Sequence, residues 1–412
     1  QATSRQRVDA TCEPHHPTNK LDAAAMPCTS DRKQAYATSV AAQAEFRPPP
    51  APIQLVDVEA AVQSLKLGRS AGPDGLKAEL IRRAVVKRDS EGSSVSVNVL
   101  LPVIHEVIAA VFDTGQYPVS WSRAAVSAVF KKGDEEERDN YRGIAVGNVI
   151  GKLYSMVIDA RMSKWSESQG HRAEGQAGFR KGYRTSDQLF VLRHVLNRKQ
   201  VNRGKTYCCF VDFRKAYDSV RRDLLLQRLA SIGIGGAMLR AVACMYSQVP
   251  MCARQDGVLS EYFDSHVGVK QGDPLSPLLF GVFIDAVEKY MRCEVPDAGV
   301  TVGQKRCQML FYADDIVLLA DDAAHLHDML NVLHGFCVSH GVSMNVPKTK
   351  VLVTGETKES MYSELWHYAG EVVEQVSVFK YLGIEVLASG GVHGSHDAVA
   401  AAAVKSMWAV VR

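Results

Sequence analysis

The sequence Phe-Tyr-Ala-Asp-Asp-Ile-Val-Leu-Leu-Ala at residues 311–320 places two adjacent carboxylates, Asp314 and Asp315, between two apolar runs. Each run, at residues 308–312 and 316–319, has the length and composition of a β-strand, so we expect a β-hairpin with both acids at its turn. Two anions in apolar surroundings are costly without a partner, and carboxylates suit Mg²⁺ or Mn²⁺. The alternative for this stretch alone is a solvated Asp-Asp turn.

Composition bounds the class of protein without revealing its function. The 412 residues can form two or three subdomains with substantial cores. The formal net charge of +3 is too small to argue for nucleic-acid binding by itself. The nine cysteines include no C-x-x-C pair, so we interpret them as buried small hydrophobes in a reducing compartment. No signal peptide and no apolar run of about 18 residues is visible, so we expect an intracellular protein without a membrane span.

The two ends of the chain differ from its middle. Residues 1–52 are polar and end in a proline-rich run, so we expect a disordered or linker-like segment. The chain stops inside an apolar, alanine-rich stretch at residues 399–411, which we predict to be helical. We therefore expect a fragment of a longer polypeptide.

Between these ends the pattern alternates between helices and strands. We predict helices at residues 76–86, 99–114, 148–162, 185–202, 214–229, 277–292 and 323–339. Residues 87–98 are predicted to be a polar insertion, and strands are predicted at residues 125–130, 207–213 and 351–354.

A third acid stands at the end of an apolar strand. Asp212 closes the predicted strand 207–213, where a carboxylate is hard to explain without a cation or another partner. Tyr217 follows five residues later, and core packing is the simpler explanation for its ring. Together with Asp314 and Asp315, Asp212 could hold two divalent ions about 3.5–4 Å apart for an in-line phosphoryl displacement.

Basic and glycine-containing loops accompany these acids. Lys131, Lys132 and Arg142 flank an acidic loop, as two arms reaching a phosphate could, although most of such a loop is ordinarily solvated. Residues 176–184 combine basic, aromatic and glycine residues, a mixture that suits nucleic acid as well as an ordinary surface loop. Residues 268–277 lead into a helix whose N-terminus favours a phosphate, or is simply capped.

The motifs together resemble those of a known family. Residues 212–220, 270–277 and 311–315 look like the central motifs of reverse transcriptases, in the same order and at similar spacing. Flanking motifs resemble those of non-LTR (LINE-type) retrotransposons, at residues 71–75, 140–144, 176–180, 345–350 and 379–383. The resemblance runs from about residue 55 to residue 385.

The resemblance implies an α+β right-hand polymerase fold. Residues 53–205 would form the fingers and residues 206–390 the palm, which carries the catalytic motifs. Residues 391–412 would begin a thumb, or a connecting helix, so that the thumb is truncated or only begun.

The resemblance also implies roles for individual residues. Asp212, Asp314 and Asp315 would carry two Mg²⁺ ions, with Mn²⁺ as a substitute. Lys348 would be a general acid near the pyrophosphate, and Tyr217 would exclude a ribose 2′-hydroxyl. The remaining contacts to the incoming nucleotide would come from Lys131 (or Lys132), Arg142, Gln271 and Gly272. Those to template and primer would come from Arg180, Phe379, Lys380, Tyr381, Leu382 and Gly383.

One motif departs from the family pattern. The chain has Tyr-Arg-Gly-Ile-Ala at residues 141–145, where the family usually has Tyr-Arg-Pro-Ile-Ser. Glycine loosens the backbone beside Arg142, which could weaken triphosphate binding. No core acid is lost.

The sequence thus predicts an RNA-directed DNA polymerase of a non-LTR retroelement. Its partners would be an RNA template, a DNA primer and dNTPs, and target-primed synthesis would place it in the nucleus; no oligomeric state is indicated. A group II intron or telomerase-like enzyme fits the flanking motifs less well, and an RNA-dependent RNA polymerase would be obstructed by Tyr217. The alternative of another class is a non-catalytic RNA-binding scaffold derived from a decayed polymerase.

Overall fold

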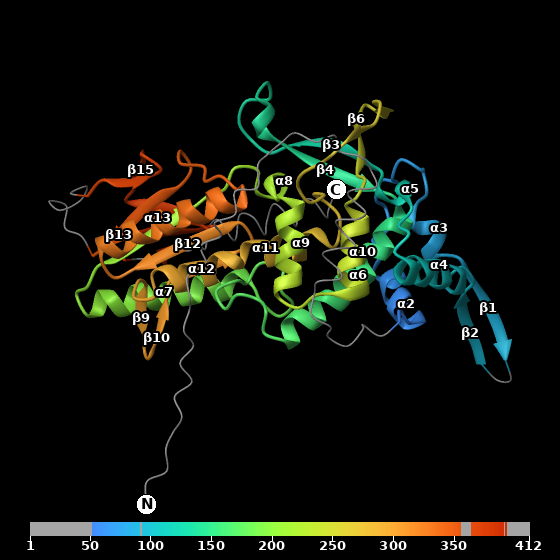
Figure 1. Ribbon diagram of the computed structural model, residues 1–412, viewed down its shortest axis with the longest axis horizontal. Helices are drawn as coiled ribbons and strands as arrows, with labels where there is room; N and C mark the ends of the chain where they lie inside the picture. The colour runs from blue at the N-terminus through green and yellow to red at the C-terminus, as the bar shows by residue number, and fades with distance from the viewer. Residues whose placement is uncertain (1–51, 91–92, 356–363, 391, 394–412) are drawn as a thin grey trace, which may run out of the picture.

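The computed structural model describes residues 52–90, 93–355, 364–390 and 392–393 (Figure 1). Both the predicted N-terminal linker and the predicted helix at 399–411 lie outside these residues. Within them the fold is mixed α+β. No described helix is long and apolar enough to span a membrane. Of the described cysteines, four are buried, Cys293 is exposed, and none forms a disulfide.

A large sheet occupies one half of the molecule, on the left in Figure 1. Within the described residues its spatial order is β11 (Met309–Tyr312), β12 (Asp315–Ala320), β5 (Thr206–Val211), β13 (Lys350–Thr354), β15 (Glu371–Gln375) and β14 (Trp366–Tyr368). Neighbours are antiparallel except β13 and β15, which are parallel. The predicted hairpin around Asp314 and Asp315 is confirmed, because β11 pairs with β12 and Tyr312 lies opposite Asp315.

The two faces of the large sheet pack into different cores, since side chains alternate along a strand. Cys209 and Val211 face a core shared with α13 (Ala323–His340) and α11 (Ser276–Ile284). Cys208 faces the other core, which is shared with α7 (Thr185–Val201) and the hairpin of β16 (Val378–Tyr381) and β17 (Ile384–Leu387). Helix α13 begins at a capping Asp322 and ends at Gly341, as its sequence signals predict.

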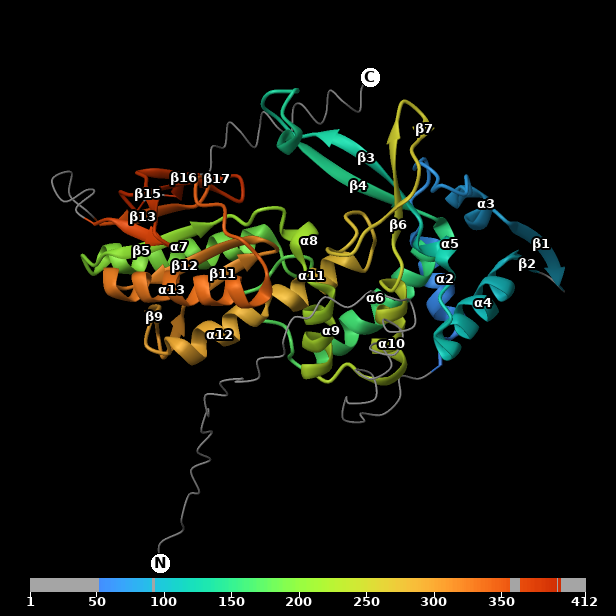
Figure 2. The ribbon, with the colours of Figure 1, turned by 45° about the horizontal axis from the view of Figure 1, so that its top comes forward.

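A second sheet projects from the other half, upward in Figure 2. Its described strands are β4 (Tyr141–Gly147), β3 (Ala124–Phe130), β6 (Pro250–Gln255) and β7 (Val258–Leu259), with β8 (Phe263–Asp264) also paired to β6. Below it pack α2 (Leu55–Ser64), α4 (Leu101–Thr114), α5 (Val119–Ser122), α6 (Val149–Ser168) and α10 (Gly236–Met245). The strand β6 joins β3 in parallel, so residues 250–255 lie beside a much earlier part of the chain.

Smaller elements complete the described fold. They are the short helix α3 (Ala78–Arg82), η1 (Arg138–Asn140), the hairpin of β9 (Val300–Val302) and β10 (Lys305–Cys307), and β18 (Val392–His393) beside β17.

Some predicted elements differ from the structure. The helix predicted at residues 76–86 is only the short α3, and the predicted polar insertion is a hairpin of β1 (Val85–Ser90) and β2 (Ser93–Asn98). The signal for β2 is the Ser-Val-Ser-Val alternation at residues 94–97, whose period of two is typical of a strand.

Two predicted helices are each divided. The helix at 214–229 is α8 (Ala216–Ser219) followed by α9 (Arg222–Ser231). The helix at 277–292 is α11 followed by α12 (Ala286–Glu294), and the break falls at Asp285. The carboxylate of Asp285 is drawn into a buried ion pair with Arg172, a contact that no local pattern encodes.

Candidate active site

The three predicted carboxylates meet at one end of the large sheet. Val211, the last residue of β5, pairs with Ile316 on β12. The next step of this antiparallel register brings Asp212 to Asp315, and Asp314 stands beside it in the β11–β12 turn. The structure therefore brings together three acids from two strands that lie about 100 residues apart in sequence.

Burial and the proximity of the other acids raise the pKa values of the two hairpin acids. Burial, with the negative charge of Asp212, raises the pKa of Asp314 above its ordinary value. Burial, with the charges of Asp314 and Asp212, raises the pKa of Asp315 to about 6. None of the three forms an ion pair with another described residue.

The backbone and carboxylate of Asp212 are fixed by residues just before β13. The side-chain amide of Asn345 donates to Oδ2 of Asp212 at 2.9 Å, and Asn345 N–H donates to the Asp212 carbonyl at 2.7 Å. The N–H of Asp212 donates to the hydroxyl of Thr349 at 3.2 Å. Sequence reasoning assigned the 345–350 motif to the family but gave these two side chains no role.

The three carboxylates are ligands of the chemical type that a divalent cation prefers, but their side chains do not converge closely in this structure. Carboxylate oxygens are hard ligands of the kind that Mg²⁺ or Mn²⁺ would bind. Asp314 and Asp315 in addition have raised pKa values and form no ion pair with a described residue. Among the described residues, however, no three His, Cys, Asp or Glu side chains converge closely enough to hold a metal ion.

Arg142 and Tyr217 face the same acids from two other elements. Arg142, on β4, lies close enough to Asp314 for its positive charge to oppose the rise of that pKa. Burial and the charge of Asp314 raise the pKa of Tyr217, whose ring stacks on Phe280. Tyr217 therefore both packs against the core, through Phe280, and lies beside the acids. That it excludes a ribose 2′-hydroxyl stays a prediction.

The predicted nucleotide-binding turn rests against β4. Ala145 N–H donates to the Gln271 carbonyl at 2.7 Å, and the Gln271 side chain donates to Asp218 at 2.9 Å. Gly272 has φ 112°, and a Cβ there would come within 2.8 Å of the Ala145 carbonyl. Glycine is thus required both by conformation and by close approach.

The predicted lysines are exposed on loops. Lys131 and Lys132 lie in the β3–β4 loop, and Lys348 lies in the turn before β13, where its N–H donates to the Asn345 carbonyl at 3.0 Å. Lys348 therefore shares a turn with a residue that holds Asp212. Contacts of these lysines with a triphosphate stay predictions.

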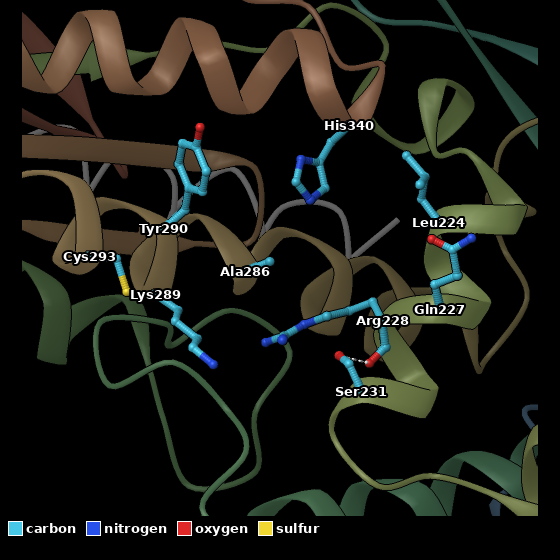
Figure 3. Close-up of a pocket in the computed structure, with 9 residues that line it drawn as sticks. All are labelled: Leu224, Gln227, Arg228, Ser231, Ala286, Lys289, Tyr290, Cys293 and His340. Atoms are coloured by element: carbon cyan, nitrogen blue, oxygen red, sulfur yellow. Dashed lines mark hydrogen bonds between the residues drawn. The ribbon is translucent and has the colours of Figure 1, made fainter. Parts of the chain in front are cut away.

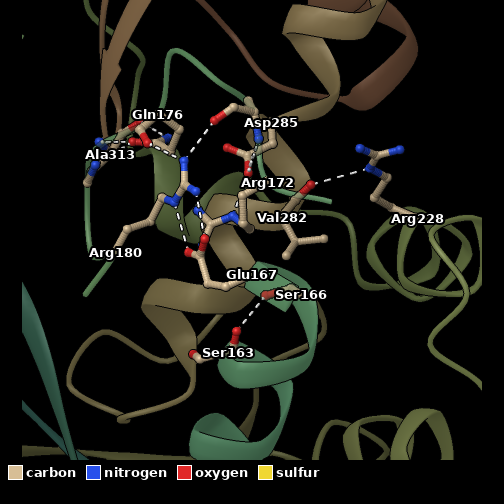
Figure 4. A network of polar contacts seen from close by, with 12 residues as sticks. Ser163, Ser166, Glu167, Arg172, Gln176, Arg180, Arg228, Val282, Asp285 and Ala313 are labelled. Atoms are coloured by element: carbon tan, nitrogen blue, oxygen red, sulfur yellow. Dashed lines mark hydrogen bonds and ion pairs between the residues drawn. The ribbon is translucent and has the colours of Figure 1, made fainter. Parts of the chain in front are cut away.

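Arg180 is already engaged within the protein (Figure 4). Its guanidinium donates two hydrogen bonds to Glu167, at 2.8 and 2.6 Å, and two to the carbonyls of Ala173 and Gln176, at 2.9 and 2.8 Å. A template contact by Arg180 stays a prediction, and it would compete with these four bonds. Exposed neighbours in the same stretch are Phe179, Lys181, Tyr183 and Arg184.

In the hairpin at residues 378–387, most of the side chains predicted to contact the primer are buried or half-buried. Phe379 stacks on Phe210 with 4.2 Å between ring centroids, and Tyr381 is buried near Asp315, whose charge adds to burial in raising the pKa of Tyr381. Leu382 and Gly383 both have positive φ, as a tight hairpin turn requires. Lys380 points to solvent. The hairpin thus lies beside the acids, with Lys380 and Gly383 exposed and Leu382 half-buried.

A separate pocket of about 370 Å³ lies between α9, α12 and the end of α13 (Figure 3). Arg228, Lys289, Tyr290 and His340 are among the residues that line it. None of the residues predicted from the sequence lines this pocket.

The fold and the site are those of a phosphoryl-transfer enzyme. Three acids lie at the ends of adjacent strands, and an arginine and a stacked tyrosine face them. Residues 129–386 match the family described as reverse transcriptase (RNA-dependent DNA polymerase), and the chain belongs to this family. The family generally uses divalent metal ions and nucleic-acid substrates.

Several curated proteins are similar to most of this chain. The "Retrovirus-related Pol polyprotein from type-1 retrotransposable element R2" of Popillia japonica is 25% identical over 81% of this chain and 44% of its own length. The "Probable RNA-directed DNA polymerase from transposon BS" of Drosophila melanogaster is 25% identical over 86% and 38%. The corresponding enzyme from mobile element jockey of Drosophila funebris is 23% identical over 82% and 35%.

The chain spans less than half the length of these relatives. Among solved structures, an apo telomerase from Candida tropicalis, truncated from its C-terminal domain, has a TM-score of 0.47 and 12% identity. That likeness covers 78% of this chain and 66% of the telomerase chain.

Proposed function

We propose that this chain is the polymerase core of a non-LTR retroelement, which extends a DNA 3′-end on an RNA template. The observation that carries the proposal is the meeting of Asp212 with Asp314 and Asp315 at the ends of paired strands, where burial, together with the charge of Asp212, raises the pKa of each hairpin acid. Family membership and the similarity to retrotransposon polyproteins support the same reaction.

Two Mg²⁺ ions, or Mn²⁺ in their place, would supply Lewis-acid stabilisation of the in-line displacement when bound by the three carboxylates. The protein's own groups do the rest. Asn345 holds the Asp212 carboxylate in one orientation, and Arg142 presents its positive charge where a triphosphate would lie. The Tyr217 ring, held by its stack on Phe280, would exclude a ribose 2′-hydroxyl. Lys348 would hold a proton at Nζ for the leaving pyrophosphate.

The nucleic acid would lie between the two sheets, beside the three acids. We assign residues 53–205 to the fingers and residues 206–390, with the large sheet, to the palm. The strand β6 of the palm segment pairs with β3 of the fingers segment. Lys380 and Gly383 would contact the primer backbone, because they are exposed residues of a hairpin whose Tyr381 lies near Asp315. A nuclear location follows from target-primed synthesis as part of this proposal.

The test is incorporation of dTTP on a poly(rA) template with an oligo(dT) primer in Mg²⁺. The parent chain is compared with Asp314→Asn and with Asp328→Asn, a matched change at an exposed acid on α13. We expect incorporation by the parent and by Asp328→Asn, and a loss of about 100-fold or more in Asp314→Asn, because removing a charge that stabilises the transition state costs that much.

Two outcomes would contradict the proposal. Equal incorporation by the parent and Asp314→Asn would remove the site assignment and indicate a contaminating polymerase. RNA binding by the parent with no incorporation by any of the three proteins would favour the non-catalytic scaffold.

A further inference from the structure

The turn that carries Asp314 is held in an unfavourable backbone conformation. Ala313 precedes Asp314 and has φ 61°, in the left-handed region that glycine adopts readily and alanine does not. Ala313 is also buried, so its backbone N–H and carbonyl cannot rely on water. Such a conformation persists only when surrounding contacts impose it.

Gln176 supplies those contacts. Its side-chain oxygen accepts hydrogen bonds from Ala313 N–H at 2.9 Å and from Gly178 N–H at 2.7 Å. Its side-chain nitrogen donates to the Ala313 carbonyl in a longer contact of 3.4 Å. One amide therefore reaches both polar groups of Ala313, and Gln176 itself is fully buried, with 0% exposure. Figure 4 shows Gln176 and Ala313 side by side.

The segment around Gln176 lies along the outer edge of β11. Phe311 N–H donates to the Gly175 carbonyl at 2.8 Å, and Ala177 N–H donates to the Phe311 carbonyl at 3.0 Å. Gly178 lies so close to the turn that a Cβ there would meet Ala313 N at 2.1 Å. The segment is thus seated directly against the turn, with no room for a side chain at Gly178.

The same segment is anchored on its other side. Arg172 and Asp285 form an ion pair at 2.6 Å in which both side chains are almost completely buried, and Asp285 also accepts from Ala173 N–H. Downstream, Arg180 is tied to Glu167 and to the Gln176 carbonyl. Gln176 therefore connects the turn to a rigid frame built from α6 and the α11–α12 break (Figure 4).

We propose that Gln176 is a positioning residue: its amide fixes the backbone of Ala313 and thereby presents Asp314 and Asp315 in one orientation for catalysis. This inference rests on the proposed polymerase function for its catalytic consequence, but its structural claim concerns the turn alone. The competing explanation is a buried amide that contributes only to global stability.

Gln308 offers a matched control. It is also buried, it directly precedes β11, and its amide donates to the Val295 carbonyl at 2.7 Å without touching the turn. Gln176→Leu and Gln308→Leu each remove a buried amide near the same hairpin, and only the first removes the acceptor for Ala313 N–H. Gln176→Met, which keeps the side-chain length, replaces Gln176→Leu if that variant does not fold.

The first readout is amide hydrogen exchange in a peptide covering residues 309–316. The parent and both variants are compared under conditions in which the same fraction of each protein is globally unfolded. We expect faster exchange of one amide in Gln176→Leu and parent-like exchange in Gln308→Leu, because Ala313 N–H loses its acceptor only in the first. The second readout is kinetic. In Gln176→Leu we expect kcat to fall about 10- to 100-fold with the KM for dTTP changed much less, since misplaced reacting groups lower kcat.

Parent-like exchange in Gln176→Leu would overturn the inference, as would kinetic losses equal to those of Gln308→Leu. A parent chain that incorporates no nucleotide would contradict the proposed function instead, and the exchange experiment would still decide whether Gln176 holds the turn.

Discussion

The ring of Tyr217 lies nearly parallel to that of Phe280, with 4.6 Å between centroids and 15° between planes. Tyr217 belongs to α8, the first helix after β5 and Asp212, whereas Phe280 is buried on α11. The stack connects the two elements and removes the freedom that a half-buried tyrosine would otherwise have. A rigid ring beside Asp314 is what steric discrimination between two sugars requires.

Replacing Tyr217 with alanine is expected to relax sugar selection. Without the ring, a ribose 2′-hydroxyl meets no obstacle, so the ratio of rNTP to dNTP incorporation should rise by about tenfold or more. Single-nucleotide extension with UTP and dTTP measures this ratio. Tyr217→Phe keeps the ring and should behave like the parent; a relaxed ratio in that control would show that the hydroxyl, not the ring, discriminates.

Removing the amide of Asn345 is expected to weaken metal-dependent activity. Asn345→Ala leaves the Asp212 carboxylate without its side-chain donor, and loss of a group that orients a metal ligand typically costs about 10- to 100-fold in metal affinity or activity. A titration of incorporation against Mg²⁺ should show a higher midpoint, a lower maximum, or both. An unchanged titration would mean that the hydrogen bonds of the Asp212 backbone, to the Thr349 hydroxyl and from Asn345 N–H, are enough to position this acid.

Asp159 is expected to make the folded state less stable above pH 6. Burial raises its pKa to about 6, while the unfolded value is ordinary, so the folded state binds the proton more tightly. Its contribution is therefore favourable at low pH and is lost as pH rises towards 6. Asp159→Asn should raise the free energy of unfolding by about 1–3 kcal/mol at pH 7.5 and by much less at pH 4.

Urea unfolding at the two pH values measures the effect of Asp159→Asn. The exposed Asp328→Asn serves as the control and should change stability little at either pH. A gain of the same size at both pH values would point to packing instead of ionisation.

A methyl group at Gly178 is expected to displace the catalytic turn. The Cβ of Gly178→Ala would meet backbone atoms of Ala313, which cannot rotate away as a side chain could. We expect lower stability, by about 1–3 kcal/mol for such overpacking, together with a loss of incorporation. Gly204→Ala is the control, since a Cβ there makes contacts no closer than 3.5 Å. Parent-like activity of Gly178→Ala would show that the turn tolerates a shift.

Local sequence patterns were sufficient for the hairpin around Asp314 and Asp315. Two apolar runs of strand length on either side of a short polar turn have few other solutions, and the acids mark the turn directly. Asp212 could be predicted in the same way, as an acid at the end of an apolar strand. The resemblance of ordered motifs then related the three, although their positions are far apart in sequence.

Helix boundaries show where local patterns fail. The apolar pattern runs without interruption through Asp285, yet the helix is divided there, at the residue whose carboxylate forms a buried pair with Arg172, 113 positions away. The hairpin of β1 and β2 was missed for a different reason: a short Ser-Val alternation among charged residues is a weak strand signal.

The sequence by itself predicted which groups would carry the chemistry: the three acids, the arginine and tyrosine beside them, and the hairpin that presents two of the acids. The acids and the hairpin follow from residue type and from periodicity over a few neighbours, whereas the role given to the tyrosine follows from the resemblance to reverse transcriptases. Only the tertiary structure decided what holds them. Gln176 and Ala313 lie 137 positions apart, and Asn345 and Asp212 lie 133 apart. A hydrogen bond depends on distance and direction in space, so its partner is defined only once the sheet and its surrounding segments have packed together.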